Sequence, residues 1–473
     1  MSSDMSGNVV KTPTGLKVNG SEKLDYNFHY VSPVFDISHA KLAETYKPWG
    51  RVLIVLDKIV AGIYQKPIEE YFAHYKVPAH FKLINGGELN KNMDTFEEIV
   101  DFLDASGLVR QEPLLVVGGG LVTDVAGYVC ASYRRSTPFI RVPTTLIGLI
   151  DASVSIKVGL NHKKLKNRLG AYFAPVDTYL DFSFLKTLPE GQVRNGTAEL
   201  IKICTVSEKR IWDLLVKHGK QLVETGYGFK NDDKELKAIG DDICKSGIEE
   251  MLRLESGNLH ELMLDRVIAF GHSWSPTCEL GTSPLPLRHG HAIMIDMAYS
   301  ITLAHSRGML TDAMRDEWFT LATQVGLSID HPQFDAKLLQ LSTRAIEKTR
   351  NGKQRFAVPD GEFGKCTFLN DVSDEELAKV LETHKKFVAD RFPNYKGQDA
   401  YVDSGDLGED VEKYIENKKN GGETLSGGCD HSHGNGTAPS LKKVDGSAAK
   451  AAVAAGAAVN SNGQIVNGQD GTA

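Results

Sequence analysis

Residues 51–145 alternate strand-like runs with helical segments, and this alternation restricts the fold more than any other feature of the chain. The strand-like runs lie at 51–56, 80–84, 113–117 and 139–143. Short apolar runs of this kind are typical of strands buried on both faces of a parallel sheet, with the intervening helices as crossover connections. The sequence therefore predicts an α/β fold whose N-terminal part is a parallel sheet with helices on both faces.

The pattern changes near residue 190, after which helical periodicity dominates. Helices are predicted over residues 200–218, 234–254, 259–270, 289–306 and 312–325. Both ends of the chain are poor in large apolar groups, which predicts disorder because such segments bury too little surface to offset the ordering entropy. We therefore expect a disordered leader over 1–25, a sheet domain over 26–190, a helical domain over 191–400, and a linker with a disordered low-complexity tail over 401–473.

The composition argues against several classes of protein. The formal net charge of -7 disfavours nucleic-acid binding as the main function. The six cysteines are scattered without a paired spacing, so we expect no disulfide framework. No run reaches about 18 apolar residues and the first residues lack a signal core, so we expect a cytoplasmic protein with no membrane partner.

A candidate metal site is split over three distant positions. Glu199 lies in a helical pattern, His272 follows a glycine, and His289 begins another helix. One carboxylate and two imidazoles are enough to hold a catalytic zinc and leave a coordination position open. A single histidine more often caps a helix or packs locally, so the triad is a hypothesis. The Cys429–His433 tract also has metal-binding residue types, but in a low-complexity tail we interpret it as incidental.

A glycine triplet, Gly118–Gly120, ends one predicted strand and precedes Asp124. The spacing differs from the dinucleotide-binding fingerprint, and such a turn serves close packing about as often as it binds a ligand. Its context favours a ligand site, because the carboxyl ends of parallel strands meet at the edge where α/β proteins bind ligands. Other polar residues that follow strand ends are Asp57, Glu88, Thr144 and Thr145.

A group of basic and amide side chains is a candidate phosphate site: Lys157, Lys166, Asn167 and Lys202. Most lysines lie on solvated surfaces, but Lys202 follows Glu199 by three residues and shares its helical face. A metal site and a nucleotide site together suggest an enzyme that oxidises an alcohol while a Lewis acid polarises it.

With these motifs the chain resembles the sugar phosphate cyclases, the family that includes 3-dehydroquinate synthase. The resemblance runs from about residue 50 to 390. It rests on motifs in the family's order: Gly86-Gly87-Glu88 with Lys91, 118–124, Pro143-Thr144-Thr145-Leu146, 151–157, Lys166-Asn167, 198–202, Phe270-Gly271-His272 and His289-Gly290. It implies an N-terminal Rossmann-like domain that binds NAD, a C-terminal mainly α-helical domain that binds metal and substrate, a site in the cleft, and a homodimer.

The resemblance also implies roles for individual residues. Zn²⁺, or Co²⁺ in its place, would be held by Glu199, His272 and His289. NAD would contact Asp57, Glu88, Lys91, Gly119, Gly120, Leu121, Asp124, Thr144, Thr145, Ile147, Asp151, Lys157, Lys166, Phe184, Thr187, Leu188 and Gln192. The sugar phosphate would meet Asp151, Lys157, Lys166, Asn167, Lys202, Asp265 and Lys348, and Arg135 would reach the phosphate bound in the neighbouring subunit.

Three positions depart from the 3-dehydroquinate synthase pattern. Pro276 and Asp265 stand where that enzyme has a histidine and an arginine, and His291 replaces a glutamate. The loss of cationic and imidazole groups suits a neutral polyol end better than a carboxylate. Residues 141–157, 274–276 and 287–291 look most like the desmethyl-4-deoxygadusol synthases, the cyclases that open mycosporine biosynthesis.

The resemblance therefore implies a phosphorus–oxygen lyase. The expected reaction is NAD- and zinc-dependent conversion of sedoheptulose 7-phosphate to desmethyl-4-deoxygadusol with release of phosphate. The first alternative is a 2-epi-5-epi-valiolone synthase, which uses the same substrate. Further alternatives are a 3-dehydroquinate synthase, a metal-dependent polyol dehydrogenase, and a scaffold in which the metal and nucleotide motifs are vestigial.

Overall fold

The structure is a computed structural model that describes residues 5–162, 165–419, 458–459 and 465–466. The chain divides into two compact units, residues 1–428 and 429–473. In the second unit the described residues form two short strands, β13 (Ala458–Val459) and β14 (Ile465–Val466), which pair antiparallel. The Cys429–His433 tract lies outside the described residues. In the part of the chain that the structure describes, no helix is both long and apolar enough to cross a membrane.

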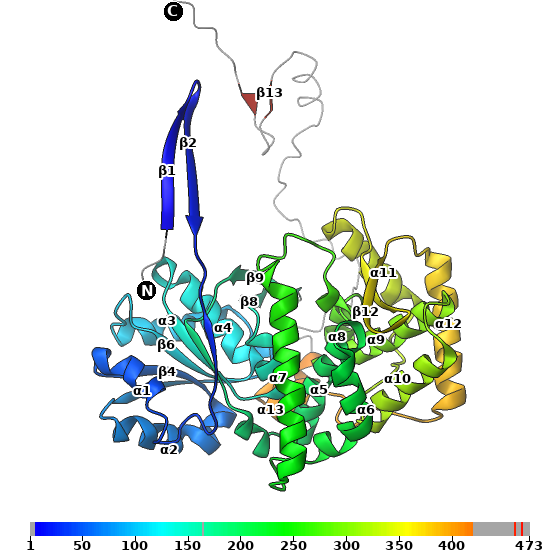
Figure 1. Cartoon of the computed structure of the whole chain (residues 1–473), viewed down its shortest axis with the longest axis horizontal. Helices are drawn as coiled ribbons and strands as arrows, with labels where there is room; N and C mark the ends of the chain where they lie inside the picture. Colours follow the sequence, from blue (N-terminus) through cyan, green and yellow to red (C-terminus); the bar gives the residue numbers. More distant parts are fainter. Residues whose placement is uncertain (1–4, 163–164, 420–457, 460–464, 467–473) are drawn as a thin grey trace, which may run out of the picture. The chain divides into compact units, whose positions relative to one another are not determined.

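A six-stranded parallel sheet forms the N-terminal half of the first unit and confirms the predicted fold class (Figure 1). Its strand order is β3 (Asn27–Tyr30), β10 (Asp177–Leu180), β7 (Phe139–Pro143), β6 (Leu114–Gly118), β4 (Val52–Asp57) and β5 (Ala79–Ile84). The four predicted strand-like runs correspond to four neighbouring strands of this sheet, β7, β6, β4 and β5. In register, Ile54 pairs with Leu115 and Leu115 with Ile140, so one apolar row crosses the sheet.

Helices cover both faces of this sheet because alternate residues of its central strands point in opposite directions. Ile54 and Leu115 pack with α1 (Lys41–Tyr46) and α2 (Lys58–His74). Leu53 and Leu114 pack on the other face, with α3 (Met93–Ala105) and α4 (Gly120–Ser132). Figure 1 shows the two pairs of helices on opposite sides of β4 and β6.

A small hairpin extends this half toward the helices. Strands β8 (Lys157–His162) and β9 (Leu165–Tyr172) pair antiparallel. The hairpin packs on α4 where Gly127 faces Val158; a Cβ on Gly127 would lie 2.5 Å from a Val158 methyl group. Because β8 begins at Lys157, this packing places the hairpin's lysines beside the carboxyl ends of the sheet.

The C-terminal half is mainly helical. Its helices are α5 (Glu190–Val206), α6 (Lys209–Glu224), α7 (Lys234–Ser256), α8 (Ser275–Gly281), α9 (His289–Ser306), α10 (Asp312–Gln324), α11 (Ala336–Thr349) and α12 (Asp374–Arg391). One antiparallel pair interrupts them, β11 (Phe356–Asp360) with β12 (Glu362–Leu369). All residues of α5 from Val193 to Val206 and of α9 from Gly290 to Ala304 are buried, so these two helices form the centre of the half.

The helix predicted over residues 259–270 is wrong, because only η6 (Val267–Ala269) is helical there. Leu262 and Met263 supplied part of the apolar pattern, but they are 87% and 58% exposed. The Asn258 side chain instead closes a turn, since its amide donates to Met263 O and its carbonyl accepts from Met263 N. Side-chain bonds of this kind compete with helix formation.

The leader predicted to be disordered forms a hairpin in the structure, β1 (Met5–Thr12) paired with β2 (Gly15–Glu22) (Figure 1). Its residues from Ser6 to Glu22 are exposed. The prediction of disorder considered only how much apolar surface the segment can bury, so it did not detect an exposed hairpin. The β-branched Val9, Val10 and Val18 and the two-residue turn Pro13-Thr14 favour the pairing locally. At the other end, the predicted linker contains α13 (Ser404–Leu407) and α14 (Val411–Lys419).

We predict that Leu115→Ala in β6 destabilises the protein by about 2–5 kcal/mol, because the leucine is fully buried and the truncation leaves a cavity. Leu16→Ala in the hairpin is the matched control, since Leu16 is 70% exposed and should change the free energy of unfolding by less than about 0.5 kcal/mol. Denaturant unfolding of both variants measures this difference. Equal effects would contradict the assigned core.

Candidate active site

Three separate elements bring the predicted metal ligands together. Glu199 lies in the middle of α5, His289 is the first residue of α9, and His272 follows η6. Glu199 Oε1 is 3.0 Å from His289 Nε2 and 3.8 Å from His272 Nε2. One ligand atom from each residue lies within 4.8 Å of the other two, so the three side chains form a group that could hold one metal ion.

Close backbone packing sets this geometry. The amide of Gly290 donates to Asn195 Oδ1, and a Cβ on Gly290 would lie 2.5 Å from Asn195 O. The missing side chain thus lets the start of α9 touch α5 one turn before Glu199. Gly271 has a φ of +76°, which favours glycine, and this turn directs His272 toward the same point.

Both histidines present Nε2 to the site because Nδ1 is engaged elsewhere. His272 Nδ1 lies 3.2 Å from Phe270 O, and His289 Nδ1 lies 3.0 Å from Glu279 Oε2. Such partners fix the ring orientation and the tautomer of metal-binding histidines. Burial, together with the nearby Lys202, lowers the pKa of His272 to about 3. His272 is therefore neutral near pH 7. Burial opposes the charged form of His289, but Glu279 and Glu199 raise its pKa to about 9, so a metal that binds His289 would displace a proton.

The Glu199 carboxylate is fully buried and paired with Lys202, whose side chain is 3% exposed. Burial alone would raise the pKa of Glu199, but the Lys202 ammonium and the hydrogen bond from His289 hold it well below its usual range. Lys202 Nζ also lies 3.9 Å from Asp151 Oδ2. Burial and the nearby Glu199 raise the pKa of Asp151 to about 6. An ionised carboxylate with two imidazoles is a donor set that suits Zn²⁺ or Co²⁺.

Polar side chains gather at the carboxyl edge of the sheet. Lys91 Nζ donates to Asp124 Oδ2 at 2.6 Å and to Asn167 Oδ1 at 2.7 Å. Asn161 Nδ2 donates to Glu88 Oε1 at 2.8 Å. These bonds hold four of the predicted site residues against one another.

Glycines at the start of α4 let the backbone approach its neighbours more closely than residues with side chains would allow. Gly119 and Gly120 form its first turn, and a Cβ on Gly120 would lie 2.9 Å from Ala152 Cβ. Thr144 Oγ1 is buried beside this turn without a hydrogen-bond partner among the described residues. Free backbone amides at a helix start bind phosphate groups well, so the turn fits a pyrophosphate. Asp57 caps α2 through Ile59 N at 2.7 Å and also faces Gly86.

Two family models match adjacent stretches of the chain, which together span residues 81–348. The model for the 3-dehydroquinate synthase N-terminal domain matches residues 81–195, and the C-terminal model matches residues 196–348. The chain belongs to the 3-dehydroquinate synthase family of sugar phosphate cyclases.

Three relatives show where the chain lies within these cyclases. It is 47% identical to the demethyl-4-deoxygadusol synthase of Trichormus variabilis over 82% of this chain and 94% of that one. The names demethyl- and desmethyl-4-deoxygadusol synthase denote the same enzyme. It is 38% identical to a 2-epi-5-epi-valiolone synthase of Actinoplanes, over 78% and 93%. The solved 2-epi-5-epi-valiolone synthase ValA of Streptomyces hygroscopicus, with NAD⁺ and Zn²⁺ bound, superposes with a TM-score of 0.74 at 35% identity, over 78% and 99%.

Lys157 of this cyclase lines a cavity of about 100 Å³ next to the metal half of the site. Its ammonium lies 3.1 Å from Glu255 and 3.2 Å from Glu261. Asp265 and Arg266 line the same cavity, and Asp265 pairs with Arg355. Asp265 therefore shares a cavity with Lys157, but its carboxylate already has a cationic partner.

Other predicted residues lie farther from these contacts. Lys348 is on the exposed side of α11, and Arg135 is exposed in the turn after α4. Gln192 donates to Asp406, and Thr187 bonds Tyr64 at 2.8 Å. Among the remaining residues, Phe184 and Leu188 are buried, whereas Leu121 and Ile147 are half-buried.

The two other departures from the 3-dehydroquinate synthase pattern act indirectly. His291 is fully buried, and its Nδ1 lies 2.8 Å from Ser328 Oγ, so this ring bonds Ser328 rather than the metal triad. Pro276 lies in the first turn of α8, where a missing N–H costs no helical bond.

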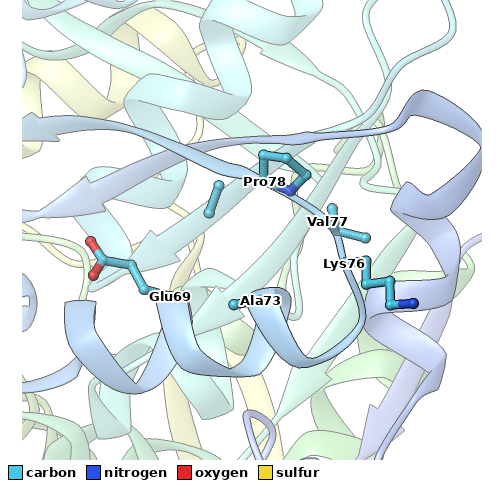
Figure 2. A pocket seen from close by; sticks show the side chains of 6 residues that line it. Glu69, Ala73, Lys76, Val77 and Pro78 are labelled. Atoms are coloured by element: carbon cyan, nitrogen blue, oxygen red, sulfur yellow. The ribbon is translucent and has the colours of Figure 1, made fainter.

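A larger hollow of about 320 Å³ lies between the end of α2 and the start of β5 (Figure 2). Its lining residues are Glu69, Ala73, Lys76, Val77, Pro78 and Ala79. Because β5 begins here, the hollow is at the amino edge of the parallel sheet, whereas ligands of such sheets bind at the carboxyl edge. It therefore plays no part in the site.

Glu279 is the main residue that the sequence argument missed. Its carboxylate, 6% exposed, contacts both His289 Nδ1 and Lys166 Nζ, the latter at 2.7 Å. Lys166 also lies 3.6 Å from Glu88. Glu279 and Lys166 thus connect a metal ligand with the sheet edge. An acidic residue on a short helix between the two histidines was the only available signal.

We predict that Glu279→Gln weakens zinc binding by about 10–100-fold, because an amide cannot hold His289 Nδ1–H and the Lys166 ammonium as a carboxylate does. Zinc competition with a chromogenic chelator measures the affinity. Glu250→Gln is the control, since Glu250 is equally buried but pairs with Arg253 and Ser207 away from the triad. Equal zinc affinity in the wild type and in Glu279→Gln would refute the role.

Proposed function

We propose that this cyclase converts sedoheptulose 7-phosphate to demethyl-4-deoxygadusol with release of phosphate and one water, as a phosphorus–oxygen lyase that uses NAD and Zn²⁺ or Co²⁺. The observation that carries the proposal is the 47% identity to a demethyl-4-deoxygadusol synthase across 94% of that enzyme. The metal triad and the glycine turn fit the two cofactors named for the solved relative ValA.

The proposal assigns the sheet half, residues 26–190, to NAD and the helical half, residues 191–400, to metal and substrate. Glu199, His272 and His289 would hold the metal. When bound, NAD supplies reversible oxidation of a substrate carbinol, and the metal supplies a Lewis acid that polarises its oxygen. The start of α4 would receive the pyrophosphate of NAD.

Lysines supply the fixed positive charge that phosphate elimination needs. Burial opposes the charged form of Lys157, but Glu255 and Glu261 raise its pKa; Glu279 and Glu88 do the same for Lys166. Both ammonium groups therefore stay protonated and would neutralise the leaving phosphate. Cations already in place stabilise developing charge without reorganisation.

Lys202 and Asp151 lie next to the metal triad, where proton transfers would occur. Lys202 would stabilise an enolate oxygen during elimination and during the aldol closure of the carbocycle. Asp151, with a pKa of about 6, titrates close to neutral pH, as a residue that relays protons should. We further propose a homodimer, in which the exposed Arg135 reaches the phosphate in the neighbouring active site.

One incubation tests the function: sedoheptulose 7-phosphate with NAD and zinc, followed by phosphate release and ultraviolet absorbance. We expect one phosphate per product, a conjugated product that absorbs, and no accumulation of NADH. A product without absorbance would favour the valiolone synthase. Activity only on the heptulosonate phosphate that leads to 3-dehydroquinate, or NADH accumulation from polyols, would contradict the cyclisation of sedoheptulose 7-phosphate.

We also predict that Lys202→Met lowers kcat by at least about 100-fold, because the site loses a buried cation beside the reacting oxygen. Lys209→Met is the control, since Lys209 is 54% exposed on α6. The same phosphate-release assay measures both variants. Similar rates for the two variants would remove Lys202 from the mechanism.

A further inference from the structure

The segment of residues 397–408, which contains α13, touches both halves of the active site. We call it the strap. It lies beyond residue 348, where the match to the C-terminal family model ends. It begins near α5 and α9 and ends at the loop Gly86–Lys91, which contains η2 (Glu88–Asn90).

The strap binds the metal half through Arg288, the residue before the metal ligand His289. Arg288 Nε donates to Asp406 Oδ2 at 2.7 Å, and Nη1 donates to Asp399 O at 2.8 Å. The backbone amide of Arg288 donates to Ala400 O at 2.8 Å. The Arg288 side chain is 6% exposed, so this charge depends on the strap for its partners.

The strap also binds α5, the helix that carries Glu199. Gln192 Nε2 donates to Asp406 Oδ1, and Arg194 Nη1 donates to Asp399 Oδ2 at 2.6 Å. One oxygen of Asp406 therefore accepts a hydrogen bond from Gln192 in α5, the helix that carries Glu199. The other accepts one from Arg288, which directly precedes α9 and its metal ligand His289. Gln192, which the sequence argument assigned to NAD, is used here to hold the strap.

The backbone of Asp406 lies against the nucleotide loop Gly86–Lys91. A Cβ on Gly87 would lie 1.4 Å from Asp406 O, so the strap fits only against a glycine. Asn90 Nδ2 donates to Gly86 O at 2.7 Å and to Leu407 O at 3.4 Å. The side-chain amide of Asn90 thus donates to both the loop and the strap. The strap ends in a turn at Gly408, which has a φ of +71° and lies beside Asn85.

We propose that Asp406 is a positioning residue that ties the nucleotide loop Gly86–Lys91 to the helices of the metal site. Its side chain fixes the strap to Arg288 and Gln192, and its carbonyl packs directly against Gly87. The inference rests on the nucleotide role proposed above for this loop. Weakening the strap should therefore weaken NAD binding while leaving the metal ligands in place.

The test compares Asp406→Asn with the wild-type chain. An asparagine turns one carboxylate oxygen into an NH₂ group, which faces a donor from either Arg288 or Gln192. We expect the Kd for NAD, measured by calorimetry on the zinc-loaded full chain, to rise about tenfold. Zinc content should stay at the wild-type level, and amide hydrogen exchange in residues 85–91 should become faster.

Glu412→Gln is the matched control, because it makes the same carboxylate-to-amide change on the exposed start of α14, outside the strap. It should leave the Kd for NAD and the exchange of residues 85–91 unchanged. An unchanged Kd and unchanged exchange in Asp406→Asn would overturn the proposal. A wild-type protein that binds no NAD would instead overturn the proposed function.

The wild type gives a second test that does not depend on a folded variant. NAD should slow amide exchange in residues 398–408 as well as in 85–91, because Asn90 donates to Leu407 O and Gly87 packs against Asp406 O. Protection of residues 85–91 by NAD without any change in 398–408 would show that the strap is not connected to the nucleotide site.

Discussion

The active site depends on one buried carboxylate. Glu199 lies in the middle of a helix that is buried on all sides, and an isolated ionised carboxylate there would be strongly destabilising. Lys202 on the same helical face and the two imidazoles offset that cost. Removal of one partner from such a group typically costs several kcal/mol, so the positions of α5, α9 and the His272 turn depend on one another.

Buried charge pairs extend from this centre to the sheet. Glu279 holds His289 and Lys166, and Lys166 approaches Glu88 at the carboxyl edge. Lys157 is held by Glu255 and Glu261 in the same way. Lys157 and Lys166, which we expect to meet phosphate, are thus already paired with carboxylates from the helical half. A bound phosphate would replace these carboxylates as the partner of each lysine. Because Glu255 lies in α7 and Glu279 in α8, substrate binding would then be coupled to the positions of these two helices.

The sequence predicted the elements whose signal is local. Continuous apolar runs identified the four strands from β7 to β5, whereas the metal triad, split over three distant positions, was recognised from its ligand chemistry together with the order of the family's motifs. Prediction from sequence failed for residues whose role depends on contacts with residues far away in the chain. Glu279 has no local mark of function, and Asp406 acquires its partners only when residues more than a hundred positions apart meet. The helix expected over residues 259–270 failed because a side-chain turn at Asn258 competes with it.

Zinc titration of the metal-free chain tests the central claim most directly. The account predicts one tight Zn²⁺ site per chain that Glu199→Ala weakens by at least about 100-fold. Glu224→Ala, at a carboxylate that is 51% exposed on α6, should retain wild-type affinity. Wild-type zinc affinity in Glu199→Ala would contradict the account, because it would place the metal somewhere other than between α5, α9 and the His272 turn.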